Sequence, residues 1–171
     1  EADAVSVSNR FLQKKFKGTL LPHCRDTSVL DPQKFNPDEI KERIGLADKK
    51  VVMFLGTPRP HKGIDDLLIA LKQINISGLR LVIIGVENQQ DFLKGVDQSI
   101  RDRVVVLTKI PFQNLPEFLS AADIIAIPQR QTSDSVGQIP ARLFDAMSMA
   151  KPIIATRVSD IPEVLEDCGY L

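Results

Sequence analysis

The sequence has no excess of either charge. Its 171 residues include 22 Lys and Arg against 22 Asp and Glu, so the formal net charge is zero. Proteins that bind nucleic acids usually carry a basic excess. The balance therefore argues against a nucleic-acid partner, although it leaves room for a local cationic site that binds a small anion.

Cysteine and long apolar runs are scarce as well. Cys24 and Cys168 lie far apart and match no CxxC or Cys/His metal spacing. No apolar run approaches the roughly 20 residues of a membrane span, and the N-terminal residues lack the charged-then-apolar pattern of a signal sequence. We predict reduced cysteines in a soluble cytoplasmic domain. The opening residues, EADAV, resemble the interior of a longer chain.

Short apolar runs alternate with helix patterns along most of the chain. The runs are continuously apolar, as in strands that helices cover on both faces. We predict strands over 51–56, 79–85, 103–108, 123–128 and 151–156, and helices over 63–76, 89–102, 115–122, 140–150 and 161–167. Repeated strand–helix units of this length predict a parallel sheet in a Rossmann-like, doubly wound α/β domain.

The first 50 residues are less regular. We expect a strand in AVSVS (4–8), a helix in NRFLQKKFK (9–17), and a loop leading into a polar helix in DPQKFNPDEIKERIGL (31–46). In open parallel sheets, ligands bind at the carboxyl ends of the strands, beside helix N-termini. Two loops at such ends carry the strongest features.

The first is the turn GTPRPHKG, residues 56–63. Gly56 and Gly63 permit close approach of a ligand to the backbone, and the helix that follows presents unpaired N–H groups. Arg59 and Lys62 add cationic donors for phosphate oxygens. The pattern is neither a P-loop nor GxGxxG. By itself, the turn is equally compatible with a phosphate site and with a glycine-flanked loop of solvated cations.

The second loop leads into SDSVGQIPARLFDAMSMAKPIIAT, residues 133–156. Gly137 and Pro140 indicate a helix start. Arg142 and Asp145 are three residues apart and share a helix face. A carboxylate one turn into such a helix can accept hydrogen bonds from the hydroxyls of a ribose. The alternative is an exposed Arg–Asp pair on an ordinary helix, which contributes little free energy.

Taken together, these segments resemble a known family, the GT-B glycosyltransferases of the family 4 (group 1) type. The resemblance covers FLGTPRPHKGIDDLLIAL (54–71), LRLVIIG (79–85), LTKIPFQNLPEFLSAADIIAIPQ (107–129), IPARLFDAMSMAKPIIATRVSDIPEVL (139–165) and the lead-in DAVSVSNRF (3–11). Segments of this kind in the same order are far more specific than any one of them.

The resemblance implies the C-terminal, donor-binding domain of a retaining, metal-independent glycosyltransferase. Lys62 and Arg59 would contact the diphosphate of a nucleotide sugar, the backbone of residues 108–110 would meet the base, and Asp145 would hold the ribose. The expected catalytic residues are Lys62, Arg59 and Asp134. The expected donor-binding residues are Gly56, Thr57, Gly63, Thr108, Lys109, Ile110, Gly137, Gln138, Ile139, Pro140, Arg142 and Asp145.

The family's Glu-x7-Glu motif is altered in this chain. Asp145 stands at the position of the second acid, and Gly137 stands where the first acid is expected. Asp134 is the nearest carboxylate to that position, which is why it joins the expected catalytic set. Of the two histidines, His23 and His61, the second adjoins Lys62; a solvated loop histidine and a donor contact are both compatible with its position.

For the organisation of the protein, we expect residues 1–171 to form a single nucleotide-sugar-binding domain with 1–45 as a hinge-side lead-in. The N-terminal acceptor domain of such enzymes, and their closing helices after EDCGYL, would lie outside this chain. The expected ligand is a nucleotide-diphosphate sugar, with no cofactor and no metal, and membrane association of the full-length protein stays open. A nucleotide-sugar epimerase and a degenerate, non-catalytic domain in protein assembly are the alternatives.

Overall fold

A computed structural model describes residues 3–171. Five parallel strands form the central sheet in the order β5-β4-β3-β6-β7. The strands are β3 (Lys50–Leu55), β4 (Leu79–Ile84), β5 (Val104–Leu107), β6 (Ile124–Ile127) and β7 (Ile153–Ala155). The α-helices around it are α2 (Pro37–Arg43), α3 (Ile64–Gln73), α4 (Gln89–Lys94), α5 (Leu115–Ser120), α6 (Ala141–Ser148) and α7 (Ile161–Leu165). The predicted doubly wound α/β fold and all five predicted strands are confirmed.

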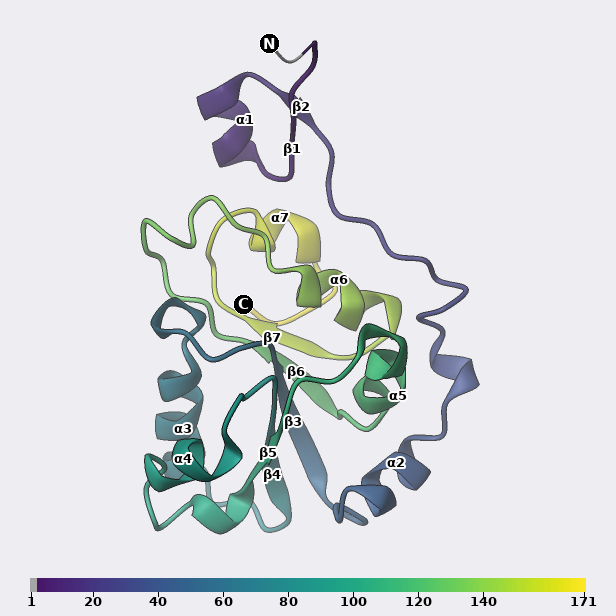
Figure 1. Cartoon of the computed structure of the whole chain (residues 1–171), viewed down its shortest axis with the longest axis vertical. Coiled ribbons are helices and arrows are strands. Elements are labelled where there is room, and N and C mark those ends of the chain that lie inside the picture. The colour runs from purple at the N-terminus through teal and green to yellow at the C-terminus, as the bar shows by residue number, and fades with distance from the viewer. Residues whose placement is uncertain (1–2) are drawn as a thin grey trace.

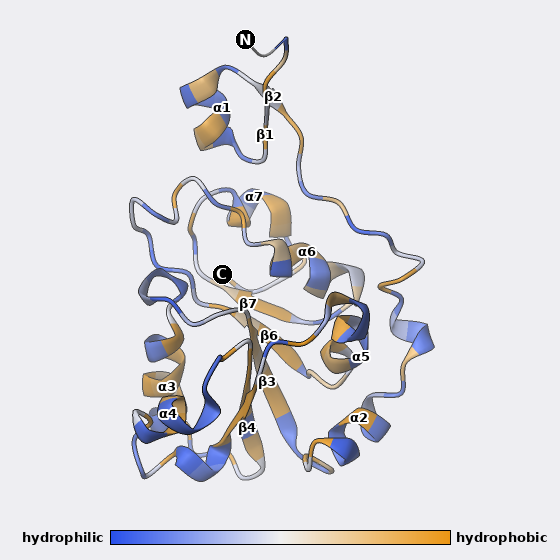
Figure 2. Cartoon of the chain, viewed as in Figure 1, coloured by the Kyte–Doolittle hydropathy of each residue, from blue (hydrophilic) through white to orange (hydrophobic). Residues whose placement is uncertain are grey.

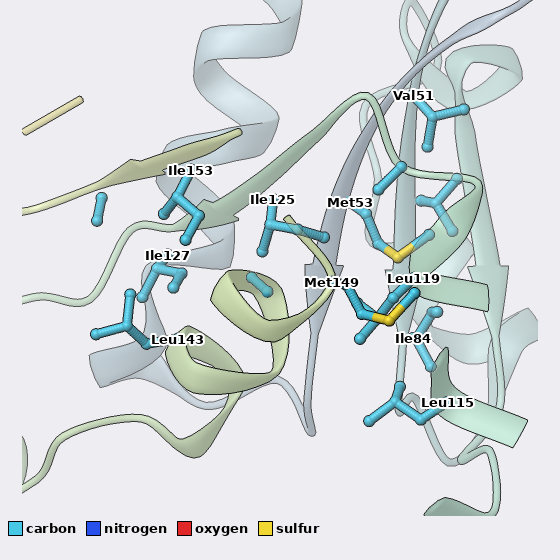
Figure 3. Packing of buried hydrophobic residues seen from close by; sticks show 14 of the residues in the cluster. Val51, Met53, Ile84, Leu115, Leu119, Ile125, Ile127, Leu143, Met149 and Ile153 are labelled. Atoms are coloured by element: carbon cyan, nitrogen blue, oxygen red, sulfur yellow. The ribbon is translucent and has the colours of Figure 1, made fainter. Parts of the chain in front are cut away.

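Helices cover both faces of this sheet because alternate strand residues point to opposite sides. On β3, Val51 and Met53 pack in a core with α5, α6 and α7. Phe54, on the same strand, packs on the opposite face with α3. Figure 1 shows α3 and α4 on one side of the sheet and α5 and α6 on the other. In Figure 2 the strands are the most continuously hydrophobic part of the chain, and Figure 3 shows one of the two cores.

The helix predictions hold with shorter bounds. The pattern over 63–76 becomes α3, and its apolar face buries Ile64 and Leu71. The stretch over 89–102 divides into α4 and the 3-10 turn η3 (Arg101–Arg103), separated by residues 95–100. No helix among residues 3–171 has the length and apolar character that a membrane span requires.

The N-terminal residues form a small unit of their own. A parallel pair, β1 (Ser6–Val7) and β2 (Thr19–Leu20), is connected by α1 (Arg10–Phe16). The sequence predicts β1 within 4–8 and α1 within 9–17, but it does not predict β2. An extended segment then runs to η1 (Pro32–Lys34) and α2 (Figure 1). The start of α1 touches the main body, where the Arg10 N–H donates to Asp160 Oδ2 at 2.7 Å.

Candidate functional site

The order of the strands places a ligand crevice beside β3. The chain runs outward from β3 through β4 to β5 and then returns to the other side of β3 with β6. At such a switch point, the loops after the two central strands diverge and leave room for a ligand. Two pockets open here, and they share Leu55 and Gly56 at the end of β3.

The first pocket is the more polar of the two and contains the cationic side chains of Lys62 and Arg142, with a volume of about 440 Å³. Its lining comes from the end of β3, the loop before α6, the first turns of α6 and the N-terminal segment. The residues are Ser8, His23, Leu55, Gly56, Lys62, Gln129, Gly137, Gln138, Ile139, Pro140, Ala141, Arg142 and Asp145. We call it the cationic pocket.

Arg142 is the most unusual side chain of the cationic pocket. It is 7% exposed, its guanidinium carbon lies 4.7 Å from the centre of the Phe54 ring, and Nη1 donates to the Leu55 carbonyl at 3.0 Å. Nε and Nη2 are buried without a hydrogen-bond partner, and no carboxylate of residues 3–171 forms an ion pair with it. Burial lowers its pKa to about 10, which leaves the group charged at neutral pH. A buried cation without an anion is costly unless a ligand supplies one.

Lys62 approaches the same point from the other side. A Cβ built on Gly56 would lie 3.4 Å from Lys62 Nζ and 3.4 Å from Arg142 Nη1, so the two cations flank the Gly56 backbone. Burial, followed by the charges of Arg142 and Arg59, lowers the pKa of Lys62. Like charges held this close favour an anion between them.

The first turn of α6 faces the same pocket. Pro140 precedes the helix, and no side chain caps it, so the leading N–H groups and the positive end of the helix dipole are directed at the cavity. Arg142, Gly56, Lys62 and this helix start thus meet as the sequence predicts. The exposed Arg142–Asp145 pair that we considered for this helix is wrong, because both residues are buried.

The second pocket is mainly apolar, with a volume of about 480 Å³. It lies across the ends of β3, β4 and β5. Its lining residues are Leu55, Gly56, Thr57, Ile84, Gly85, Lys109, Ile110, Pro111, Phe112 and Leu115. We call it the apolar pocket. Four residues expected to bind the donor line it: Gly56, Thr57, Lys109 and Ile110.

Four of the expected site residues line neither pocket. Gly63 is buried at the end of the turn 56–63, and Thr108 directly precedes Lys109, which lines the apolar pocket. Arg59 is exposed, and its charge contributes to the lowered pKa of Lys62. Asp134 is exposed in the loop before α6, and its carbonyl accepts from Gln138 Nε2 at 2.6 Å. The catalytic role of Asp134 stays a prediction.

Several pocket residues have no counterpart in the sequence-based set. Gln129 follows β6 and is 2% exposed, and the rule about carboxyl ends of strands is a signal that points to it. Ser8 and His23 come from the N-terminal segment, and no local pattern marks them. The ring of His23 meets Phe144 of α6 edge to face, with centroids 5.6 Å apart. His61 is half-buried and lines neither pocket.

An ion pair fastens the turn that carries Lys62. Arg130, just after β6, donates through Nε and Nη2 to the two Asp66 oxygens, each at 2.7 Å, and its backbone N–H donates to the His61 carbonyl at 2.8 Å. The Arg130 hydrogen bonds lower the pKa of Asp66. Residues that follow two different strands are thereby held at a fixed spacing.

Replacing Asp66 with alanine is expected to weaken binding of a diphosphate in the cationic pocket about threefold to tenfold, since the turn that carries Lys62 loses its brace. The free energy of unfolding should change by less than about 1 kcal/mol, because the pair is largely exposed. Calorimetric titration with UDP and GDP measures the first quantity, and urea unfolding measures the second. Asp65→Ala is the control, because Asp65 is the neighbouring residue and forms no ion pair within residues 3–171. Equal losses for the two variants would contradict the brace.

No group of three or more His, Cys, Asp or Glu side chains within residues 3–171 is arranged to hold a metal ion. In the same part of the chain, Cys24 and Cys168 are free and exposed.

Known proteins are similar to this chain in sequence and in fold. The family described as "Glycosyl transferases group 1" matches residues 49–171. A GDP-mannose-dependent alpha-(1-6)-phosphatidylinositol monomannoside mannosyltransferase of Mycolicibacterium smegmatis is 27% identical over 98% of this chain and 47% of its own length. A D-inositol 3-phosphate glycosyltransferase of Mycobacteroides abscessus is 31% identical over 71% of this chain and 27% of its own length. The chain thus spans about half the length of the first relative and about a quarter of the length of the second.

Solved structures agree on the fold. Anabaena HepE, in a complex with UDP and glucose, superposes with a TM-score of 0.81 at 20% identity over 99% of this chain and 49% of HepE. The C-terminal domain of LpcC, a group 1 glycosyl transferase of Francisella tularensis, gives 0.66 at 22% identity over 86% of this chain and 78% of that domain. The chain therefore belongs to the group 1 glycosyl transferases, and its fold is that of their Rossmann-like GT-B domains.

Proposed function

We propose that this chain is the donor-binding half of a retaining glycosyltransferase, which transfers a sugar from a nucleotide-diphosphate sugar to an acceptor. The observation that carries the proposal is the buried Arg142 guanidinium, which has two unpartnered nitrogens and lies with Lys62 around Gly56. A diphosphate supplies the anion that these cations lack.

The adjoining apolar pocket supports a nucleotide rather than a bare phosphate. Gly56 lies where the cationic and apolar pockets meet, so the base of a nucleotide can enter the apolar side while the rest of the donor stays in the cationic pocket. HepE, which shares the fold, binds UDP and UDP-glucose. The part of the relatives that this chain does not span would bind the acceptor.

The proposed chemistry depends on charge at the leaving group. As the bond between sugar and diphosphate breaks, negative charge develops on the diphosphate oxygens. Arg142, Lys62 and the start of α6 are fixed around that position before the reaction begins, and such preorganised donors stabilise developing charge without reorganisation. We propose that these groups perform the task that a divalent metal performs in other transferases.

The free, exposed cysteines support our proposal of a cytoplasmic location.

Lys62→Ala tests the diphosphate contact. We expect nucleoside diphosphate affinity to fall about tenfold to a hundredfold, since a hydrogen bond to a charged group contributes about 1.5–3 kcal/mol. Calorimetry with UDP, GDP and their sugars measures the loss. Lys50→Ala, at the amino end of the same strand β3, is the control and should bind as the wild type does. If Lys62→Ala retains full affinity in a protein that binds nucleotide, the assignment of Lys62 is wrong.

A further inference from the structure

Arg25 lies in the segment between β2 and η1, and all three nitrogens of its guanidinium group donate hydrogen bonds, two of them to α6. Nε donates to Asp145 Oδ1, Nη2 donates to the Ala141 carbonyl at 3.1 Å, and Nη1 donates to the carbonyl of Cys24 at 2.8 Å. The side chains are 17% exposed for Arg25 and 6% exposed for Asp145. Solvent therefore screens the pair only weakly.

These bonds engage only one oxygen of the Asp145 carboxylate. Among residues 3–171, the Asp145 carboxylate accepts one hydrogen bond, from Arg25 Nε to Oδ1, and Oδ2 receives none. Asp145 lines the cationic pocket, and its second oxygen is not among the buried unpartnered atoms. A carboxylate held by one oxygen in this way keeps its orientation and retains the other oxygen as an acceptor for a ligand.

Arg25 also changes the charge that a ligand meets in the cationic pocket. Lys62 and Arg142 carry positive charge, and an unpaired Asp145 would oppose the binding of an anion beside them. The ion pair with Arg25 cancels the Asp145 charge locally, so the two cations remain for the two negative charges of a diphosphate bridging a nucleoside and a sugar. The paired Asp145 carboxylate can then accept hydrogen bonds from a ligand without opposing the binding of the diphosphate beside it.

We propose that Arg25 is a positioning residue for the ribose of the donor: it holds Asp145 by Oδ1 so that Oδ2 accepts hydrogen bonds from the vicinal ribose hydroxyls. The inference rests on the proposed function, since it needs a nucleotide in the cationic pocket. It assigns a part of the nucleotide site to the segment between β2 and η1, which is far from α6 in sequence. Arg25 thus selects ribonucleotides over nucleotides that lack the hydroxyls.

The test compares ligands with and without the ribose hydroxyls. UDP, GDP and their 2′,3′-dideoxy analogues are titrated calorimetrically into the full protein and its Arg25→Met variant. We expect the wild type to bind the better ribonucleotide about tenfold more tightly than its dideoxy analogue. In Arg25→Met this preference should vanish because Asp145 loses its orientation, and the dideoxy analogue should also bind more weakly than it binds the wild type because Asp145 then carries an unpaired negative charge.

Two further variants keep the proposal falsifiable. Arg25→Lys retains the positive charge with fewer donors, and it should keep part of the preference for ribose. It also serves as the test variant if Arg25→Met folds poorly. Asp145→Asn should lose the preference in the same way as Arg25→Met. The proposal is overturned if Arg25→Met and Arg25→Lys keep the wild-type ratio of affinities for the ribonucleotide and its dideoxy analogue, including the case in which both ligands are weakened equally. If the wild type binds no nucleoside diphosphate at all, the proposed function fails instead, and the two failures are distinct.

Discussion

Replacing Arg142 with methionine is expected to reduce the affinity for a nucleoside diphosphate about a hundredfold while leaving the ligand-free protein as stable as before, or more stable. Nε and Nη2 form no hydrogen bond within residues 3–171, and Arg142 lines the cationic pocket. A charge-assisted hydrogen bond from the guanidinium to a bound diphosphate contributes about 1.5–3 kcal/mol, so the loss of one or two such bonds accounts for a decrease in affinity of about a hundredfold. Calorimetry with UDP and GDP measures the loss of affinity.

The opposite effect on stability follows from burial. Without a ligand, the guanidinium is a buried charge that no carboxylate of residues 3–171 pairs with, and replacing such a group by an apolar side chain of similar length is often neutral or stabilising. Methionine can still pack on the ring of Phe54. Urea unfolding without nucleotide measures this contribution. Arg101→Met, in the 3-10 turn η3 before β5 and outside both pockets, is the control. A large loss of stability together with unchanged affinity would make Arg142 a structural residue and contradict our account.

Gly63→Ala is expected to destabilise the protein by about 3 kcal/mol. Gly63 has φ +69, where a side chain costs about 1–2 kcal/mol, and its Cβ would lie 1.8 Å from the Pro128 carbonyl oxygen. That oxygen belongs to the backbone after β6, so relief requires the strand and α3 to separate, at a further cost of about 1–3 kcal/mol. Because Lys62 precedes Gly63, the cationic pocket should be distorted as well.

Gly45 separates these two contributions. It has nearly the same φ, +70, but a Cβ there meets nothing within 4 Å. Gly45→Ala should therefore cost only the backbone strain, about 1–2 kcal/mol. Chemical denaturation of both variants gives the difference. Equal destabilisation would show that the contact between Gly63 and β6 contributes nothing.

The sequence was sufficient for the frame of the site. Continuously apolar strands predict a parallel sheet, and a parallel sheet brings its carboxyl ends to one edge, so Gly56, Lys62 and Arg142 were expected to meet although they are far apart in the chain. These inferences need only local patterns and a general rule of topology. Their success reflects the strong local preferences of the strand–helix units.

The surroundings of Asp145 required the structure. Helical spacing puts Arg142 and Asp145 on one face, but it does not say that Arg142 turns toward Phe54 and that Asp145 binds Arg25 instead. Arg25 lies in an irregular segment 120 residues earlier, where no periodicity marks it. The position of Asp134 depends on a loop that Ser135 folds through its own hydrogen bonds, including one from the Thr132 N–H at 2.8 Å. Long-range contacts and irregular loops carry no such local signal.

The measurement that tests the central claim most directly is a calorimetric titration of the folded protein with UDP, GDP, the matching monophosphates and the uncharged nucleosides. We expect one diphosphate to bind, its monophosphate to bind at least tenfold more weakly, and its nucleoside not to bind detectably, because Arg142 and Lys62 contribute most when both phosphates are present. A folded protein that binds neither diphosphate nor their sugars at millimolar concentration would contradict the donor site that we propose.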